Sequence, residues 1–139
     1  MTAGDRQQLA KDVAHAEGYR SKAYRDSVGV WTIGYGCNLQ ELEIDEPLAA
    51  RWLAKKLAEA ERELERFGWY AGLTAVRQRA CIELVYNLGL PRFLSFVEMI
   101  QALREKAYTV AAAELLDSKW ARQVGPTRSR RLAEMIRNG

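Results

Sequence analysis

Apolar residues recur every three or four positions along most of the chain, which is the spacing of one face of an α-helix. The pattern predicts a first helix over residues 3–17, which Gly18 ends. It predicts a long helix over about 46–66, whose opposite face is heavily charged and therefore solvated. The next helix, about 74–88, is apolar on more than one side and is expected to be the central core helix. Further amphipathic helices are predicted at about 93–103, 108–117, 119–123 and 127–137.

Between residues 19 and 44 the helical spacing gives way to short β-prone pieces interrupted by glycine. The segment Asp26–Gly29 matches a type I turn and predicts a small hairpin. The second strand of this hairpin alternates between two faces. One face is bulky and is interpreted as packing; it holds Trp31, Ile33 and Tyr35. The other is small and is expected to let a ligand approach the backbone; it holds Val30, Thr32, Gly34 and Gly36.

The chain has 139 residues and is 48% hydrophobic, enough for one domain or for two small lobes that share a helix. We predict an α+β fold, mainly helical, with one small β-lobe. No segment approaches the roughly 18 uninterrupted apolar residues of a membrane span. The N-terminus lacks the apolar region of a signal peptide, so we expect synthesis in the cytoplasm and no stable membrane insertion. Cys37 and Cys81 lie far apart and are interpreted as reduced thiols.

The net charge of +3 is unevenly distributed, because the C-terminal segment from residue 119 has Glu134 as its only acid. Its basic residues are Lys119, Arg122, Arg128, Arg130, Arg131 and Arg137. Such a segment suggests an anionic partner: nucleic acid, lipid headgroups or an acidic cell-wall polymer. A nucleic-acid site would need an accompanying motif or interleaved aromatic residues, which are absent. We therefore favour the wall polymer and expect no nucleic-acid partner.

Two carboxylates and a hydroxyl are the best candidates for chemistry. Glu17 falls in the last turn of the first helix, where the negative end of the helix dipole favours a protonated acid. Asp26 begins the predicted turn, and Thr32 follows on the strand. Glycoside hydrolysis needs an acid for the leaving oxygen and a second carboxylate as base or nucleophile, so the set fits this reaction. By spacing alone, however, these are also ordinary surface residues.

Other candidates are weaker. His15 is the only histidine, so a metal site would lack its usual ligands, and we expect neither metal nor cofactor. Cys37 is interpreted as a packed thiol, because no neighbouring histidine would activate it as a nucleophile. The tryptophans are more often core residues, and only Trp31, next to Thr32, is a candidate wall of a sugar-binding cleft. Gly34, on the small strand face, is a candidate for close substrate approach.

Three blocks of the sequence, in order, resemble phage-type lysozymes, the muramidase endolysins of the T-even kind. The first is EGYRSKAYRD from Glu17 to Asp26, with VWTIGYG ending at Gly36. It resembles the active-site signature of that family. The second, AVRQRACIELVYNLG from Ala75, resembles its central helix, and the third, from Ala111 to Arg131, resembles its C-terminal segment.

The resemblance implies roles by position. Glu17 is implied to be the general acid, and Asp26 with Thr32 to activate or position the water. Asn87 is implied to contact a sugar amide, and Arg128 to lie near the first helix and the acid. The implied substrate is the β-1,4 bond between N-acetylmuramic acid and N-acetylglucosamine in bacterial peptidoglycan. The implied outcome is inversion, which requires the two carboxyl groups to lie about 6.5 to 9.5 Å apart.

The resemblance also implies a single lysozyme-like domain over residues 1–139. Its parts would be a β-lobe at about 18–45, a linking helix at about 46–66, and a helical lobe at about 67–139 joined by helix 3–17. The sequence departs from the pattern at Cys37, where the best-known members have histidine. Few residues separate Cys37 from the next helix, so the β-lobe is expected to be short and its number of sugar subsites reduced.

Two other functions stay open. A lytic transglycosylase would act on the same bond and needs mainly the one acid. A non-catalytic wall-binding or phage structural module would keep the fold. For the hydrolase, the resemblance implies a monomer that is made in the host cytoplasm and reaches the wall after membrane permeabilisation, with functional dependence on a holin.

Overall fold

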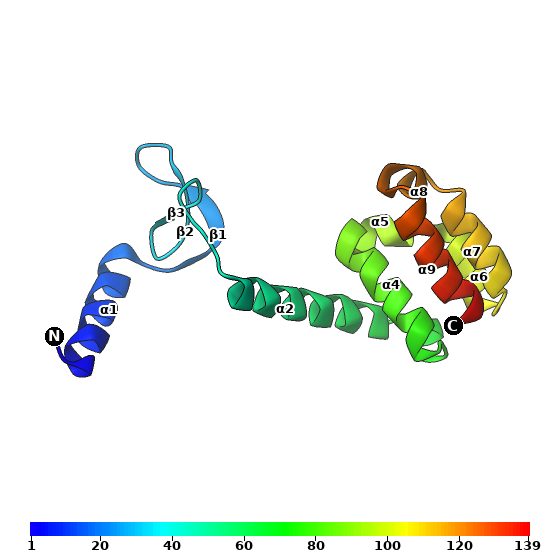
Figure 1. Ribbon diagram of the computed structural model, residues 1–139, viewed down its shortest axis with the longest axis horizontal. Helices are drawn as coiled ribbons and strands as arrows, with labels where there is room; N and C mark the ends of the chain where they lie inside the picture. The colour runs from blue at the N-terminus through cyan, green and yellow to red at the C-terminus, as the bar shows by residue number, and fades with distance from the viewer. The chain divides into compact units, whose positions relative to one another are not determined.

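The computed structural model describes residues 1–139. The chain divides into an N-terminal unit, Met1–Glu46, and a C-terminal unit, Pro47–Gly139. Helices dominate, and the only sheet is small and antiparallel, so the predicted α+β class is confirmed (Figure 1). The assignment of helix 3–17 to the helical lobe stays a prediction.

Helix α1 spans Ala3–Glu17, the predicted range. Its start is a capping box: the Asp5 N–H donates to Thr2 Oγ1 at 3.1 Å, and the Thr2 N–H donates to Asp5 Oδ2 at 2.7 Å. Gly18, with φ 72°, ends the helix as predicted. No residue of α1 is buried, and Leu9 and Val13 on its apolar face are about half exposed.

The sheet of the N-terminal unit has three antiparallel strands in the order β1-β2-β3: Arg20–Arg25, Trp31–Gly34 and Cys37–Asn38. The predicted hairpin is β1-β2, in which Arg25 pairs with Trp31 and Tyr24 with Thr32. A bulge in β1 shifts the register before Tyr24. The short strand β3 was not predicted; it makes β2 the central strand of the sheet.

The C-terminal unit begins along α2 (Glu46–Glu65) and continues through a short α3 (Gly68–Ala71) to α4 (Ala75–Leu88). Helices α5 to α9 follow at Leu90–Leu94, Val97–Arg104, Tyr108–Leu116, Lys119–Val124 and Pro126–Asn138. In this unit α4 and α7 both pack against α9 (Figure 1). The largest fully buried side chains are Leu64, Cys81, Leu84, Phe93, Met99, Leu103, Leu115, Leu132 and Ile136. The prediction that α4 is a central core helix is confirmed by its buried Ala80, Cys81, Leu84 and Val85.

The single helix predicted at about 93–103 is instead two helices, α5 and α6. At the break, the Ser95 and Phe96 N–H groups donate three residues back, to Arg92 O and Phe93 O. The Ser95 hydroxyl also donates to Arg92 O, at 2.5 Å. A serine hydroxyl that satisfies a carbonyl of the preceding turn competes with the regular helical pattern, and a separate helix begins at Val97.

Candidate active site

The carboxylate of Glu17 lies directly against the backbone at Gly36. Glu17 is the last residue of α1, and Gly36 has φ 82°, a left-handed conformation that favours glycine. A Cβ added at Gly36 would lie 2.7 Å from Glu17 Oε2 and 3.2 Å from its Cδ. Gly36 lies in the turn between β2 and β3, and the close approach to the backbone here is made by the side chain of Glu17 itself. No hydrogen bond within the protein engages this carboxylate.

Asp26 is held by the turn that it begins. The Gly29 N–H donates to Asp26 O at 3.0 Å, so the predicted turn is confirmed. Asp26 Oδ1 accepts from the Val28 and Val30 N–H groups, at 3.0 and 2.8 Å. Its Oδ2 has no partner in the protein. One carboxylate oxygen thus fixes the side chain, and the other is left for a ligand or a water.

The exposures of Trp31 and Thr32 are opposite to those expected for the two faces of β2. Thr32 is only 4% exposed, whereas Trp31, interpreted as packing, is 46% exposed. Thr32 lies on the central strand, where it is paired with Tyr24 of β1 and with Asn38 of β3. One face of the Trp31 ring is covered by the Arg25 guanidinium, 4.9 Å from the ring centroid.

The Thr32 hydroxyl donates to Val30 O at 2.9 Å, so toward a water it would act as an acceptor. Gly34, the other candidate on this face, has φ 69°, and a Cβ added there would contact nothing within 4 Å. Its glycine is therefore required by the backbone conformation and not by packing. Beside this strand, an open cavity of about 490 Å³ in the N-terminal unit is lined by Ala10, Lys11, Val13, Ala14 and Tyr35.

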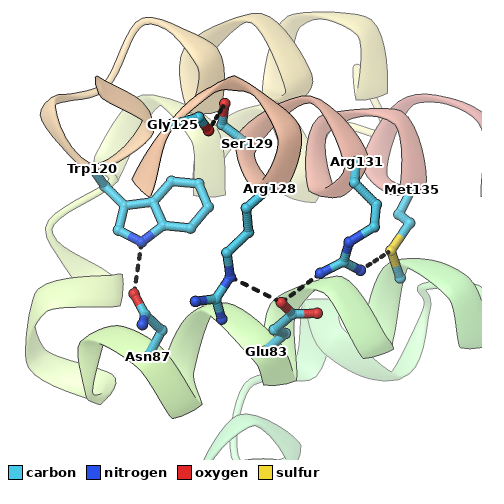
Figure 2. Close-up of polar contacts among 8 residues, drawn as sticks. All are labelled: Glu83, Asn87, Trp120, Gly125, Arg128, Ser129, Arg131 and Met135. Atoms are coloured by element: carbon cyan, nitrogen blue, oxygen red, sulfur yellow. Dashed lines mark hydrogen bonds and ion pairs between the residues drawn. The ribbon is translucent and has the colours of Figure 1, made fainter. Parts of the chain in front are cut away.

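Asn87, in the C-terminal unit, is oriented by Trp120 of α8. The buried indole donates from Nε1 to Asn87 Oδ1 at 2.8 Å (Figure 2). Because Oδ1 accepts this bond, the Nδ2 group of Asn87 remains as a donor, and the residue is set up to meet an acceptor such as a carbonyl oxygen. Sequence reasoning treated Trp120 as core alone and missed this contact, since the two residues are 33 positions apart.

Arg128, on α9, is paired with Glu83 of α4. Glu83 Oε1 accepts from Arg128 Nε at 3.1 Å and from Arg131 Nη2 at 2.6 Å (Figure 2). Burial alone would raise the pKa of Glu83, but the hydrogen bonds and charges of Arg131 and Arg128 outweigh it and hold the pKa below its usual range. Nothing in the sequence near Glu83 indicates this pairing.

The structure was also searched for a metal site, a reactive cysteine and a membrane-spanning helix. No cluster of His, Cys, Asp or Glu is arranged to hold a metal ion. Both cysteines are free thiols. Cys37 is exposed on β3, so its interpretation as a packed thiol is wrong. Burial raises the pKa of Cys81 to about 12, which makes its thiol inert. None of the helices has the length and apolar composition that a membrane crossing requires.

Residues 14–134 match the sequence model of a family described as phage lysozyme. The chain belongs to the phage lysozyme family. The matched segment contains the predicted acid, turn and strand residues together with Asn87 and Arg128. The chain is also similar to a protein of Dictyostelium discoideum named "Probable T4-type lysozyme 1". The two are 26% identical over 153 aligned positions, which cover 88% of this chain and 89% of the other. Membership of the phage lysozyme family supports a glycoside hydrolase of the lysozyme type, with peptidoglycan as its substrate.

Proposed function

We propose that this lysozyme hydrolyses the β-1,4 bond between N-acetylmuramic acid and N-acetylglucosamine, with Glu17 as general acid and Asp26 as base. The observation that carries the assignment is the contrast between the two carboxylates of the N-terminal unit. Glu17 lies against Gly36 and makes no hydrogen bond in the protein, so its proton is free to move to the glycosidic oxygen. Asp26 is fixed through Oδ1, which leaves Oδ2 to take a proton from water.

In this mechanism Glu17 protonates the leaving oxygen while a water, deprotonated by Asp26, attacks the anomeric carbon from the opposite face. Thr32 accepts a hydrogen bond from that water, because its own proton is donated to Val30 O. The water then has to fit between substrate and base, and we propose inversion for this reason. No cofactor takes part in these steps.

We further propose that Asn87 Nδ2 donates to the carbonyl oxygen of an N-acetyl group. The support is the Trp120 bond, which leaves only donors on the free side of the amide. We assign Arg128, Trp31 and Gly34 to substrate binding. Trp31 has the exposed ring face that stacking on a sugar needs.

The deciding experiment is product analysis on purified peptidoglycan. We expect Glu17→Gln and Asp26→Asn to lower kcat/KM by about 100-fold or more, the usual contribution of a general acid or base. Glu43→Gln, which changes an exposed carboxylate of the same unit, is the matched control and should retain activity. Mass spectrometry should show reducing ends, and NMR should show the inverted anomer as the first product.

Each alternative has its own result in this assay. Products with only 1,6-anhydro ends would identify a lytic transglycosylase and would contradict hydrolysis. Binding to the wall without cleavage by the wild-type protein would identify a non-catalytic module. A folded, fully active Glu17→Gln variant would remove Glu17 from the mechanism.

For the biological setting, we propose an endolysin that works as a monomer and reaches the wall after a holin or an equivalent pore opens the membrane. The support is membership of the phage lysozyme family. Expression in bacteria should then cause lysis only when the inner membrane is permeabilised. We also retain the proposal that α1 belongs with the helical lobe.

A further inference from the structure

A cavity of the C-terminal unit, next to Asn87, carries only positive charge. Its volume is about 290 Å³, and its charged lining residues are Arg92 of α5 and Lys119 of α8. No acid lines it, and the acids nearest to these cations along the chain, Glu98 and Asp117, lie outside the lining. A ligand that enters the cavity therefore meets two positive charges that no carboxylate of the lining offsets.

The hydrogen-bond donors of this cavity are free to meet a ligand. The side chains of Arg92, Lys119 and Gln123 are exposed and have no hydrogen-bond or ion-pair partner in the protein. Lys119 and Gln123 are four positions apart, which places both on one face of α8. The hydroxyls of Ser95 and Ser118 are not available as donors, because each donates to a backbone carbonyl, at 2.5 and 2.6 Å. The free donors are thus a guanidinium, an ammonium and an amide, which together suit a carboxylate.

The cavity adjoins the contact that we propose between Asn87 and an N-acetyl group. Trp120 lines the cavity, and the same indole orients Asn87 through the 2.8 Å bond from Nε1 to Oδ1 (Figure 2). Leu88, the residue after Asn87, is also part of the lining. The cavity therefore borders the place where Asn87 would hold the sugar.

Peptidoglycan has a carboxylate-bearing group close to one of its N-acetyl groups. Muramic acid carries its N-acetyl group and its lactyl group on neighbouring ring carbons. The lactyl group bears a short peptide, the stem, which has free carboxylates. A muramic acid whose acetyl oxygen is bound by Asn87 therefore has the start of its stem beside the same residue. N-acetylglucosamine has no stem, so the charge of the cavity fits muramic acid alone.

We propose that Arg92 and Lys119, together with Gln123, bind a carboxylate of the acidic peptide stem of muramic acid. This inference rests on the proposed function, in which Asn87 binds an N-acetyl group, and it assigns that group to muramic acid. Because the stem takes no part in bond cleavage, its binding stabilises the ground state and the transition state equally. Loss of either cation should therefore raise KM by about 3-fold, the size expected for an exposed ion pair, and leave kcat unchanged.

The first test compares two forms of one substrate. Soluble peptidoglycan fragments are used either unchanged or after a water-soluble carbodiimide and ammonium have converted the stem carboxylates into amides. For the wild type, we expect KM to be about 10-fold lower with the acidic form than with the amide form. Arg92→Gln/Lys119→Gln should have the wild-type kcat and show no preference between the two forms.

Arg104→Gln/Lys55→Gln is the matched control. It changes the same two residue types in the same unit, at exposed positions that do not line this cavity. Its net charge equals that of the cavity variant, so a weaker general attraction to an anionic wall would affect both proteins equally. The control should keep the wild-type preference, and a control that loses it as fully as the cavity variant would overturn the proposal. Thermal melting checks that both proteins are folded at the assay temperature.

A second readout does not depend on catalysis. The ligand is the disaccharide–peptide that muramidase cleavage releases, and the signal is the Nε1–H resonance of Trp120, followed by NMR in the intact chain. Because this indole lies between Asn87 and the cavity, the acidic fragment should shift the resonance and the amide form should shift it much less. Inorganic phosphate is the third ligand. Equal shifts with the amide form, or with phosphate at the same concentration, would contradict selective binding of the stem.

The outcomes separate this inference from the proposed function. A wild-type enzyme that cleaves both forms of the substrate with the same KM refutes the stem site alone. A wild-type protein that cleaves neither form, but whose Trp120 resonance responds to the acidic fragment, refutes the proposed hydrolysis and supports the stem site.

Discussion

The buried guanidinium of Arg77 joins three helices, and its removal should be costly. Arg77 lies in the first turn of α4 and donates from Nε to Ile136 O at 2.8 Å and from Nη2 to Arg137 O at 3.1 Å. These carbonyls belong to the last turn of α9, where the helix itself provides no donors. The guanidinium also lies over the ring of Tyr108 in α7, 3.5 Å from its centroid. Arg77→Met keeps much of the side-chain volume and removes all three contacts.

The size of the effect follows from these contacts. Each hydrogen bond from a charged donor contributes about 1.5 to 3 kcal/mol, and the cation–π contact contributes about 0.5 to 2 kcal/mol. Methionine, however, avoids the cost of keeping a charge out of water, which offsets part of the loss. We therefore expect a net loss of about 3 kcal/mol in the free energy of unfolding. For a chain of this length, that lowers the melting temperature by roughly 10 °C.

The assay is thermal and urea unfolding followed by circular dichroism. Arg79→Met is the matched control, because Arg79 lies two positions along the same helix, carries the same charge and is exposed. It should change the stability by less than about 0.5 kcal/mol. Arg77→Lys should fall between the two, since an ammonium keeps the charge but loses the planar two-carbonyl geometry. An Arg77→Met protein as stable as the Arg79→Met control would refute this account of how α9 is attached.

Three further predictions concern the site. Gly36→Ala should displace the Glu17 carboxylate and lower kcat/KM by roughly 10- to 100-fold. Gly125→Ala is its control: Gly125 has a similar φ of 86°, but an added Cβ would contact nothing within 4 Å, so the substitution should lower stability without lowering activity. The pKa of Glu83 is lower in the folded protein than its ordinary value of 4.5, so the ionised carboxylate stabilises the fold at any pH above that value. The stability advantage of the wild type over Glu83→Gln, measured by urea unfolding, should therefore shrink as the pH falls below 4.5. Asn87→Asp keeps the acceptor for Trp120 but loses the donor, so kcat/KM should fall by about 10-fold with little change in melting temperature; an active variant would exclude the acetyl contact.

The features that the sequence predicted well have local causes. The capping box of Thr2 and Asp5, the stop at Gly18 and the turn from Asp26 to Gly29 each need only a few neighbouring residues. The buried stripe of α4 follows in the same way from helical spacing. The burial of Thr32 and the exposure of Trp31 mark the limit of this reasoning. Strict alternation places Trp31 and Thr32 on opposite faces, but it does not say which of the two is buried.

The features that the sequence missed depend on residues far apart in the chain. The contact between Trp120 and Asn87, the shared Glu83, and the attachment of α9 by Arg77 join positions 33 to 60 residues apart. Nothing near any of these residues indicates its partner. The two-residue strand β3 is too short to give a periodic signal, and the break at Ser95 is marked by a side-chain hydrogen bond that helical spacing does not reveal.

The contact between Glu17 and Gly36 has a consequence for how this sequence tolerates change. Position 36 has no side chain, yet two separate demands act on it: the backbone has φ 82°, and a Cβ would meet the Glu17 carboxylate. In a deep mutational scan scored by cell lysis, we expect both Gly36 and Glu17 to reject nearly every substitution. A shorter acid at position 17 would make room for a side chain at position 36, but its carboxylate could not reach the same point in space. A second substitution at position 17 should therefore not restore the activity of a Gly36 variant.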